Sequence, residues 1–243
     1  MAHGAPDWWG RSPKETTYAI EDMAELAARL GSIVTFDRRG DIIYLDDFRN
    51  GLTGWRWGAG GAGGEVYPVA YPTQRGGVAV QLTCNTGYSS VIEIAKVFPR
   101  PVAKPVGLEV AFSPEPGAGR IAPNIIWYSG SNKYSYVCRY VHSDGVLQIR
   151  HSDGNWHTIG SPGSAPEGYG YFSIMKMVVN LLTGKHVRVI FNEHVYDTSS
   201  YEPYVTSNTR PPQLEITITH GGSDSGPSVF TVDDVIYTQN EPV

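Results

Sequence analysis

Carboxylate side chains on strand-like segments are the residues of this sequence that could most directly carry out chemistry. Retaining glycosidases use two carboxylates about 5–5.5 Å apart, which on one strand requires acidic residues at alternate positions. Glu93, Glu109 and Glu215 instead each stand alone on the polar side of a strand-like segment, which favours a solvated strand face. The sequence therefore predicts that the protein is not an enzyme. A glycoside hydrolase or lyase whose pair is assembled from distant strands is the remaining alternative.

Aspartates gather at both ends of the strand-rich region. Asp46 and Asp47 stand at its beginning, and Asp233 and Asp234 stand near its end. If the first and last strands pair, as in a jelly roll, these carboxylates meet near backbone carbonyls, and hard oxygen ligands at that density suit Ca²⁺. The alternative is that the acids cap strand ends and pair with arginines such as Arg49. We predict a structural calcium site at the four aspartates.

The elements that must position these side chains are strands. Glycine (28) and proline (17) together make 45 of the 243 residues, which excludes a helix bundle because both break helices. Apolar and polar residues alternate from Ile42 almost to the end of the chain, for example in Val78–Cys84 and Tyr134–Tyr140. We predict an all-β antiparallel sandwich, or jelly roll, over residues 46–243. Turn signals suited to tight hairpins separate the runs at residues 143–145, 152–154 and 183–185.

Residues 1–45 have a different character and are predicted to be a docking segment. An extended arm carries the pair Trp8 and Trp9, which cannot bury itself locally. A short α-helix is predicted over residues 18–30; at about 20 Å it is too short to be stable alone in water. We therefore expect the helix to dock on the main domain or on another protein. Its apolar stripe has spacings of three and four and consists of Ile20, Met23, Ala27 and Leu30.

Glycine dominates residues 58–64, which read GAGGAGG. A phosphate-binding loop would have to open a helix, and the residues that follow, Glu65 to Pro68, do not. The run therefore predicts a mobile loop, or a loop pressed against another backbone, that is available for contacts.

Counts of charged and cysteine residues narrow the class of protein. The 19 Lys and Arg against 24 Asp and Glu give a net charge of −5, and no basic run exceeds Arg38–Arg39, so no nucleic acid partner is expected. No apolar window reaches ~18 residues, which predicts no membrane partner, and the N-terminus lacks a signal peptide, which predicts synthesis in the cytoplasm. Cys84 and Cys138 are too few for a disulfide framework or a closed zinc site, so buried thiols are predicted.

Three segments of the chain together resemble the strand signatures of concanavalin A-like and carbohydrate-binding-module jelly rolls, over about residues 46–240. They are residues 46–55 (DDFRNGLTGW), 152–160 (SDGNWHTIG) and 230–238 (FTVDDVIYT). The resemblance implies a structural, non-catalytic calcium and singles out Asp47 and Asp233. Lectin-like members of these families bind sugar on an aromatic platform. The resemblance therefore implies five glycan-binding candidates: Trp55, Trp57, Trp127, Tyr128 and Trp156. The alternative for each is burial in the core, which also needs large aromatic side chains.

The N-terminal half carries a second resemblance. The start MAHGAPDWWG, residues 16–48 and residues 175–197 are similar to an uncharacterised family of tailed-phage and prophage structural genes. This implies a virion component in the capsid or tail, with no catalytic residues to carry over. We predict a capsid-decoration or tail-associated structural protein, anchored to other virion proteins through residues 1–45. The alternative is a glycan-binding module that adheres to host-surface glycan; a homo-oligomer is compatible with both.

Overall fold

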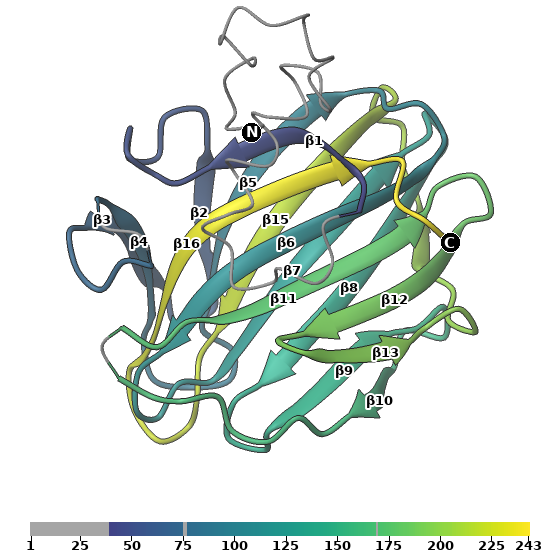
Figure 1. The fold of residues 1–243 in the computed structure, drawn as a ribbon. Coiled ribbons are helices and arrows are strands. Elements are labelled where there is room, and N and C mark those ends of the chain that lie inside the picture. Colours follow the sequence, from purple (N-terminus) through teal and green to yellow (C-terminus); the bar gives the residue numbers. More distant parts are fainter. Residues whose placement is uncertain (1–38, 75–76, 169) are drawn as a thin grey trace, which may run out of the picture.

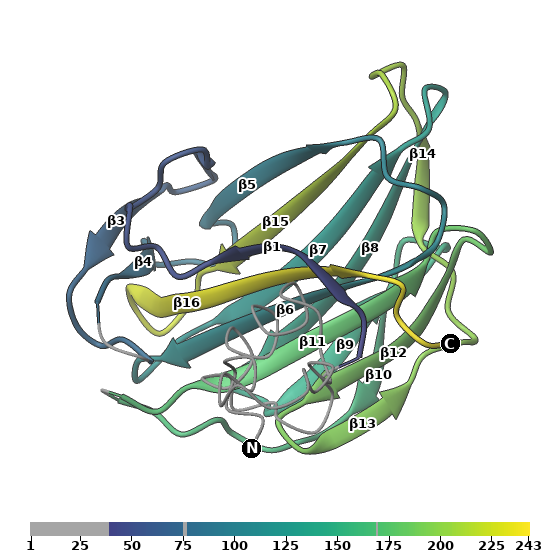
Figure 2. The same cartoon turned by 45° about the horizontal axis from the view of Figure 1, so that its top comes forward.

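The protein is a sandwich of two antiparallel β-sheets, each with eight strands (Figure 1). The computed structural model describes residues 39–74, 77–168 and 170–243, and within these ranges the chain contains no helix. Figure 2 shows the two sheets as separate layers. The predicted all-β jelly roll is confirmed. The predicted docking segment, with Trp8, Trp9 and the helix stripe Ile20, Met23, Ala27 and Leu30, lies outside the described residues.

Sheet I has the strand order β13-β12-β11-β6-β16-β4-β3, with β1 paired to β16. Its longest strand, β16, pairs with β6 along one side and with β4 and then β1 along the other. The strands are β1 (Asp41–Asp46), β3 (Gly64–Val69), β4 (Ala79–Cys84), β6 (Pro105–Pro114), β11 (Ser173–Asn180), β12 (Lys185–Phe191), β13 (His194–Asp197) and β16 (Ser228–Gln239).

Sheet II has the order β10-β9-β8-β7-β15-β5-β2, with β14 paired to β8. Strand β15 lies near its middle and pairs with β5 and β7. The strands are β2 (Arg56–Gly60), β5 (Val91–Pro99), β7 (Arg120–Tyr128), β8 (Asn132–Val141), β9 (Val146–Arg150), β10 (Trp156–Gly160), β14 (Tyr204–Ser207) and β15 (Gln213–Gly221).

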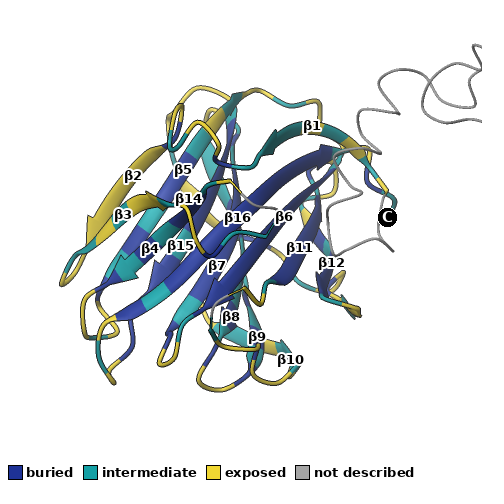
Figure 3. Cartoon of the chain, turned by 60° about the vertical axis from the view of Figure 1, so that its left-hand side comes forward, coloured by how far each residue is buried: buried dark blue, intermediate teal, exposed yellow. Residues whose placement is uncertain are grey.

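The core lies between the sheets and is built from every second residue of their strands. On β8, Tyr136, Cys138 and Tyr140 are fully buried, while Val137 and Arg139 between them are only half-buried. This is the period of two that the sequence shows, because successive side chains of a strand point to opposite faces. Figure 3 shows β6, β11 and β16 almost wholly buried, whereas β2 and β3 are exposed at the edge of the sandwich.

The turns at residues 143–145, 152–154 and 183–185 are hairpins, as predicted. They join β8 to β9, β9 to β10 and β11 to β12, and each pair is antiparallel neighbours. Gly145, Gly154 and Gly184 all have positive φ, which glycine adopts without steric cost. Cys84 and Cys138 are free, buried thiols, also as predicted.

The glycine run at residues 58–64 passes from one sheet to the other. Strand β2 pairs with β5 in sheet II, whereas β3, four residues later, pairs with β4 in sheet I. Gly61 has a φ of +64°, and a Cβ there would overlap the backbone carbonyl of Ser89. The alternative of a loop pressed against another backbone is therefore the one that the structure shows.

The first and last strands pair, as the calcium prediction required. Asp46 of β1 lies opposite Val235 of β16. β1 begins at Asp41, so the sandwich includes residues ahead of the predicted domain start at residue 46.

Candidate functional site

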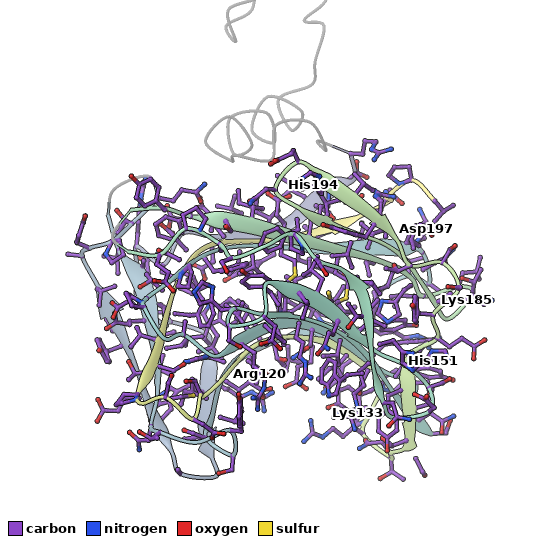
Figure 4. The ribbon with its side chains drawn as sticks, turned by 90° about the horizontal axis from the view of Figure 1, so that it is seen from below. Arg120, Lys133, His151, Lys185, His194 and Asp197 are labelled. Carbon is purple, nitrogen blue, oxygen red and sulfur yellow. The ribbon has the colours of Figure 1, made fainter. Side chains whose placement is uncertain are left out.

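A groove runs over the face of sheet II that points away from the core. Two adjoining cavities form it, with volumes of about 430 and 390 Å³. They share three lining residues from neighbouring strands, Glu93 of β5, Ile126 of β7 and Lys133 of β8. In Figure 4, Arg120 and Lys133 lie on this hollowed side, and His194 of sheet I lies on the opposite side. The two cavities thus form one continuous groove on sheet II.

Strand alternation decides which side chains reach the groove. On β15 the core takes the apolar residues Leu214, Ile216 and Ile218, and the polar residues Glu215 and Thr219, on the other face of the strand, line the groove. The same alternation on β7 and β8 brings side chains from distant parts of the sequence onto one surface. The polar lining residues from these three strands are Arg120, Asn124, Lys133, Ser135, Arg139, Glu215 and Thr219.

Glu215 is the centre of an ionic cluster at one end of the groove. Its carboxylate accepts a hydrogen bond from Arg56 Nη2 at 2.7 Å and one from the Tyr128 hydroxyl at 3.1 Å. Arg210 Nη1 lies 3.5 Å from the same carboxylate and donates to the Tyr128 hydroxyl at 3.0 Å. Burial, and then the negative charge of Glu215, raise the pKa of Tyr128 above its usual value. The cluster therefore holds two guanidinium groups and a protonated phenol at the groove.

Glu93 and Asn124 form a second polar group beside this cluster. Thr219 donates a hydrogen bond to Glu93 Oε2 at 3.0 Å, and Asn124 Nδ2 lies 2.7 Å from Thr217 Oγ1 and 3.1 Å from Thr219 Oγ1. Asn124 Oδ1 is buried and has no hydrogen-bond partner among the described residues.

The prediction that the glutamates lie on a solvated strand face is wrong for Glu109 and Glu215, which are both buried. It is also incomplete, because Glu93 and Glu215 line the same cavity although they are far apart in the sequence. Glu93 pairs with Thr219, so along the sheet the two glutamates are four residues apart, roughly 13 Å between backbones. Two carboxylates from neighbouring strands thus line one groove, although their backbones are farther apart than the 5–5.5 Å that separates the carboxyl groups of a retaining glycosidase.

Arginines dominate the other end of the groove, and neutral groups hold them in place. Arg139 donates from Nε and Nη2 to Gln148 Oε1, at 2.9 and 2.7 Å, and its guanidinium lies 3.7 Å from the ring centroid of Trp156. The guanidinium of Arg150 lies 4.3 Å from the ring centroid of Tyr204. Burial, and then repulsion from Arg120, lower the pKa of Arg139 to about 10, although Asp144 opposes the shift.

Three of the five predicted sugar-binding aromatics line the groove. They are Trp57, which is 57% exposed, Tyr128 and Trp156. The structure contradicts the prediction for the other two. Trp55 is buried in the core with its indole N–H bound to Asp46, and Trp127 stacks on Tyr134 and packs against the core, because both lie on the inward side of their segments.

Three of the four predicted calcium ligands accept hydrogen bonds or form an ion pair with donors of the protein. Asp46 accepts hydrogen bonds from the Tyr44 hydroxyl, the Trp55 indole and the Phe48 amide, and Asp47 forms an ion pair with Arg49 at 2.8 Å. Asp233 accepts from the backbone amides of Gln74 and Asp234. In the described ranges, no three His, Cys, Asp or Glu side chains come together in a way that could hold a metal ion. The oxygens of Asp46, Asp47 and Asp233 are engaged by donors of the protein, which is the alternative considered above.

Comparison with solved structures identifies the fold. The chain is similar to Cellulose induced protein Cip1 (TM-score 0.52, 16% identity, 80% of this chain and 96% of that chain). It is also similar to the alginate lyase vAL-1 from Chlorella virus (0.51, 12%, 82% and 99%) and to a sialidase (0.50, 11%, 83% of this chain but only 19% of that one). The fold is a concanavalin A-like jelly roll. No protein-family model and no curated protein sequence matches the chain.

The prediction that the protein is not an enzyme needs correction. A sialidase and an alginate lyase share this fold with the chain, so the jelly roll itself does not set it apart from enzymes. The sequence argument considered only two acids on one strand, and Glu93 and Glu215 line one cavity from neighbouring strands. In the described part of the chain, no helix is long and apolar enough to cross a membrane.

Proposed function

We propose that the groove of sheet II binds a polysaccharide chain. The observation that carries this is the placement of aromatic faces beside fixed hydrogen-bonding groups in one open groove: Trp57 and Trp156 stand among Asn124, Glu93 and Lys133. Sugars combine an apolar ring face with a rim of hydroxyls, so they need both kinds of surface. The two cavities adjoin across several strands, which suits a chain of sugars better than a single unit.

We expect Trp57→Ala and Trp156→Ala each to weaken polysaccharide binding about tenfold, because each removes an aromatic face from the groove. Affinity gel electrophoresis on a panel of cell-wall polysaccharides, followed by calorimetry on the best ligand, measures the loss. Tyr171→Ala is the matched control, since Tyr171 is 62% exposed and lines neither cavity. Wild-type protein that binds no member of the panel at millimolar sugar contradicts the proposal.

Cleavage of the bound polysaccharide is a second candidate function, and Glu93 and Glu215 facing one groove favour it. The same panel, incubated with the protein and assayed for new reducing ends and for unsaturated sugar products, separates hydrolysis from elimination. Product formation that is lost in Glu215→Gln establishes cleavage; no product from any polysaccharide that the protein binds leaves binding as the function.

The location of this module in a virion is a further part of the proposal and rests on the resemblance of residues 1–48 and 175–197 to phage structural proteins. We expect that deleting residues 1–17, with Trp8 and Trp9, abolishes incorporation into particles and leaves the jelly roll folded. Immunoblotting of purified particles measures incorporation, and circular dichroism of the truncated protein serves as the control. Unchanged incorporation of the truncated protein contradicts anchoring by the arm.

A further inference from the structure

The charge of the groove is opposite in sign to that of the whole chain. Its lining has six cationic side chains, Arg56, Arg120, Lys133, Arg139, Arg150 and Arg210, and two carboxylates, Glu93 and Glu215. The groove therefore has a net charge of +4, whereas the chain has −5, so the residues outside the groove sum to −9. Positive charge is concentrated on one face of sheet II.

The two carboxylates do not neutralise the arginine end. Glu215 pairs with Arg56 and Arg210, and Glu93 accepts a hydrogen bond from Thr219. Among the described residues, no carboxylate lies within ion-pair distance of Arg120, Lys133, Arg139 or Arg150. The unbalanced charge therefore belongs to the end of the groove over β7, β8 and β9.

Three arginines at this end are fixed in position by uncharged groups. Gln148 and the Trp156 ring hold Arg139, the Tyr204 ring lies against Arg150, and Arg120 donates from Nη2 to the Tyr88 carbonyl at 2.8 Å. Such partners orient a guanidinium without cancelling its charge, which lowers the entropic cost of binding an anion. Arg150 Nε is in addition buried without a hydrogen-bond acceptor among the described residues.

The three arginines form a diagonal row across the sheet. Arg120 of β7 lies opposite Val141 of β8, Arg139 is on β8 itself, and Arg150 of β9 follows Ile149, which lies opposite Cys138. Each step of the row thus moves one strand across and two residues along. With strands ~4.8 Å apart and ~3.3 Å per residue, successive backbones are about 8 Å apart. A row with this regular spacing fits a polymer that bears charges at regular intervals.

We propose that the groove selects an acidic polysaccharide, whose carboxylate or sulfate groups bind the row formed by Arg120, Arg139 and Arg150. The inference rests on the proposed polysaccharide-binding function and adds the class of the ligand. Guanidinium groups bind carboxylates and sulfates through paired hydrogen bonds, and the neighbouring Trp156 supplies a face for the sugar ring. An anion here also offsets the repulsion between Arg120 and Arg139 that lowers the pKa of Arg139.

An acidic polysaccharide fits this surface better than a nucleic acid does. The groove has a net charge of +4, and the remainder of the chain, which holds 13 of the 19 Lys and Arg, still has a net charge of −9. A duplex is too wide to contact the groove alone and would meet the acidic surroundings. A single sugar chain lying in the groove contacts only the positive part. Single-stranded DNA is the polyanion that tests this choice.

Calorimetry with polygalacturonate and with fully methyl-esterified polygalacturonate tests the proposal on the wild-type protein. The two polymers share a backbone and differ in charge. We expect at least tenfold tighter binding of the acid form, and a loss of that preference in high salt, because salt screens the ionic contacts. Chondroitin sulfate tests whether the groove also binds a sulfated polysaccharide. Equal binding of the acid and ester forms overturns the proposal, as does tighter binding of single-stranded DNA than of every acidic polysaccharide.

The variants Arg120→Gln, Arg139→Gln and Arg150→Gln locate the site. We expect each to weaken binding of the acidic polymer roughly ten- to a hundredfold, because hydrogen bonds between charged groups are the strong ones, and to weaken binding of the ester much less. Lys185→Gln is the matched control, since it removes one positive charge from β12 of sheet I. Thermal melting of each variant verifies that it is folded. The salt dependence is measured on the wild-type protein, so it tests the proposal even if a variant does not fold.

The outcomes separate this inference from the proposed function. Binding of neutral polysaccharides that depends on Trp57 but not on the arginines supports a polysaccharide groove and overturns its acidic selectivity. Absence of binding to every polymer, acidic or neutral, overturns both.

Discussion

Replacing Glu241 by alanine is expected to lower the free energy of unfolding by about 3–5 kcal/mol, since it removes one partner from a buried charge network. The Glu241 side chain is fully buried and lies 2.8 Å from Lys176 Nζ and 2.9 Å from Arg188 Nη2. Lys176 has no exposed surface and Arg188 has little. Without the carboxylate, two cations remain beside each other in a poorly solvated place, and chemical denaturation would record the cost directly.

Glu193→Ala is the control for this prediction. Glu193 is 72% exposed and forms an ion pair of 3.5 Å with His194, so its loss should change stability by less than about 1 kcal/mol. For a domain of this size, the Glu241 variant should melt roughly 10 °C lower than the wild type. A loss below 1 kcal/mol would mean that solvent reaches Lys176 and Arg188 when the carboxylate is gone.

Residue patterns that act locally were sufficient to predict the fold. Alternation along Tyr134–Tyr140 gave the correct core face of β8, and the turn at residues 143–145 gave the hairpin to β9. Both depend on steric properties of neighbouring residues, which a single sequence records. The pairing of the first and last strands was also predicted, since a jelly roll requires it.

The charge of the groove could not be predicted in the same way. The net charge of −5 and the absence of basic runs led to the expectation of no nucleic acid partner, and they gave no sign of the cationic groove on sheet II. Its cations are spaced over β2, β7, β8, β9 and the loop before β15, and strand order alone brings them together. Glu93 and Glu215 were missed as a pair for the same reason. The available signal was the set of isolated charged and polar residues on the outward faces of all the predicted strands. Considered together, these residues would have suggested a polar, cationic sheet face.

The calcium prediction depends on contacts that spacing does not report. Spacing placed Asp46 beside β16, where it lies opposite Val235, but it did not reveal the donors that surround this carboxylate. Asp46 accepts a hydrogen bond from the Trp55 indole and Asp47 pairs with Arg49, so a bound cation would share these carboxylates with donors of the protein. Melting the protein with and without EDTA tests the prediction, because a metal bound only by the folded state raises the melting temperature.

Trp55→Ala and Trp57→Ala, two residues apart, are expected to give opposite results. Trp55 is 7% exposed, packs on Phe48 with ring centroids 5.7 Å apart, and donates its indole N–H to Asp46 at 2.9 Å. Its truncation should cost about 3–5 kcal/mol in unfolding free energy, since a large cavity remains and Asp46 loses one of its hydrogen-bond donors. Trp57 lies on the groove and is mostly exposed, so its loss should weaken polysaccharide binding and leave stability within about 0.5 kcal/mol.

Stability and polysaccharide affinity are measured on both variants, to determine which tryptophan belongs to the core and which to the groove. Denaturation gives the stability, and calorimetry with the best polysaccharide, at a temperature where both variants are folded, gives the affinity. A Trp55 variant that is as stable as the wild type but binds weakly would contradict the burial of this ring. The opposite effects follow from where the two rings lie, since Trp55 packs in the core with Asp46 while β2, which begins at Arg56, presents Trp57 to the groove. Two tryptophans that are two residues apart thus have different roles: Trp55 stabilises the core, and Trp57 lines the groove. Residue type alone does not distinguish these roles, so it predicted too many sugar-binding aromatics.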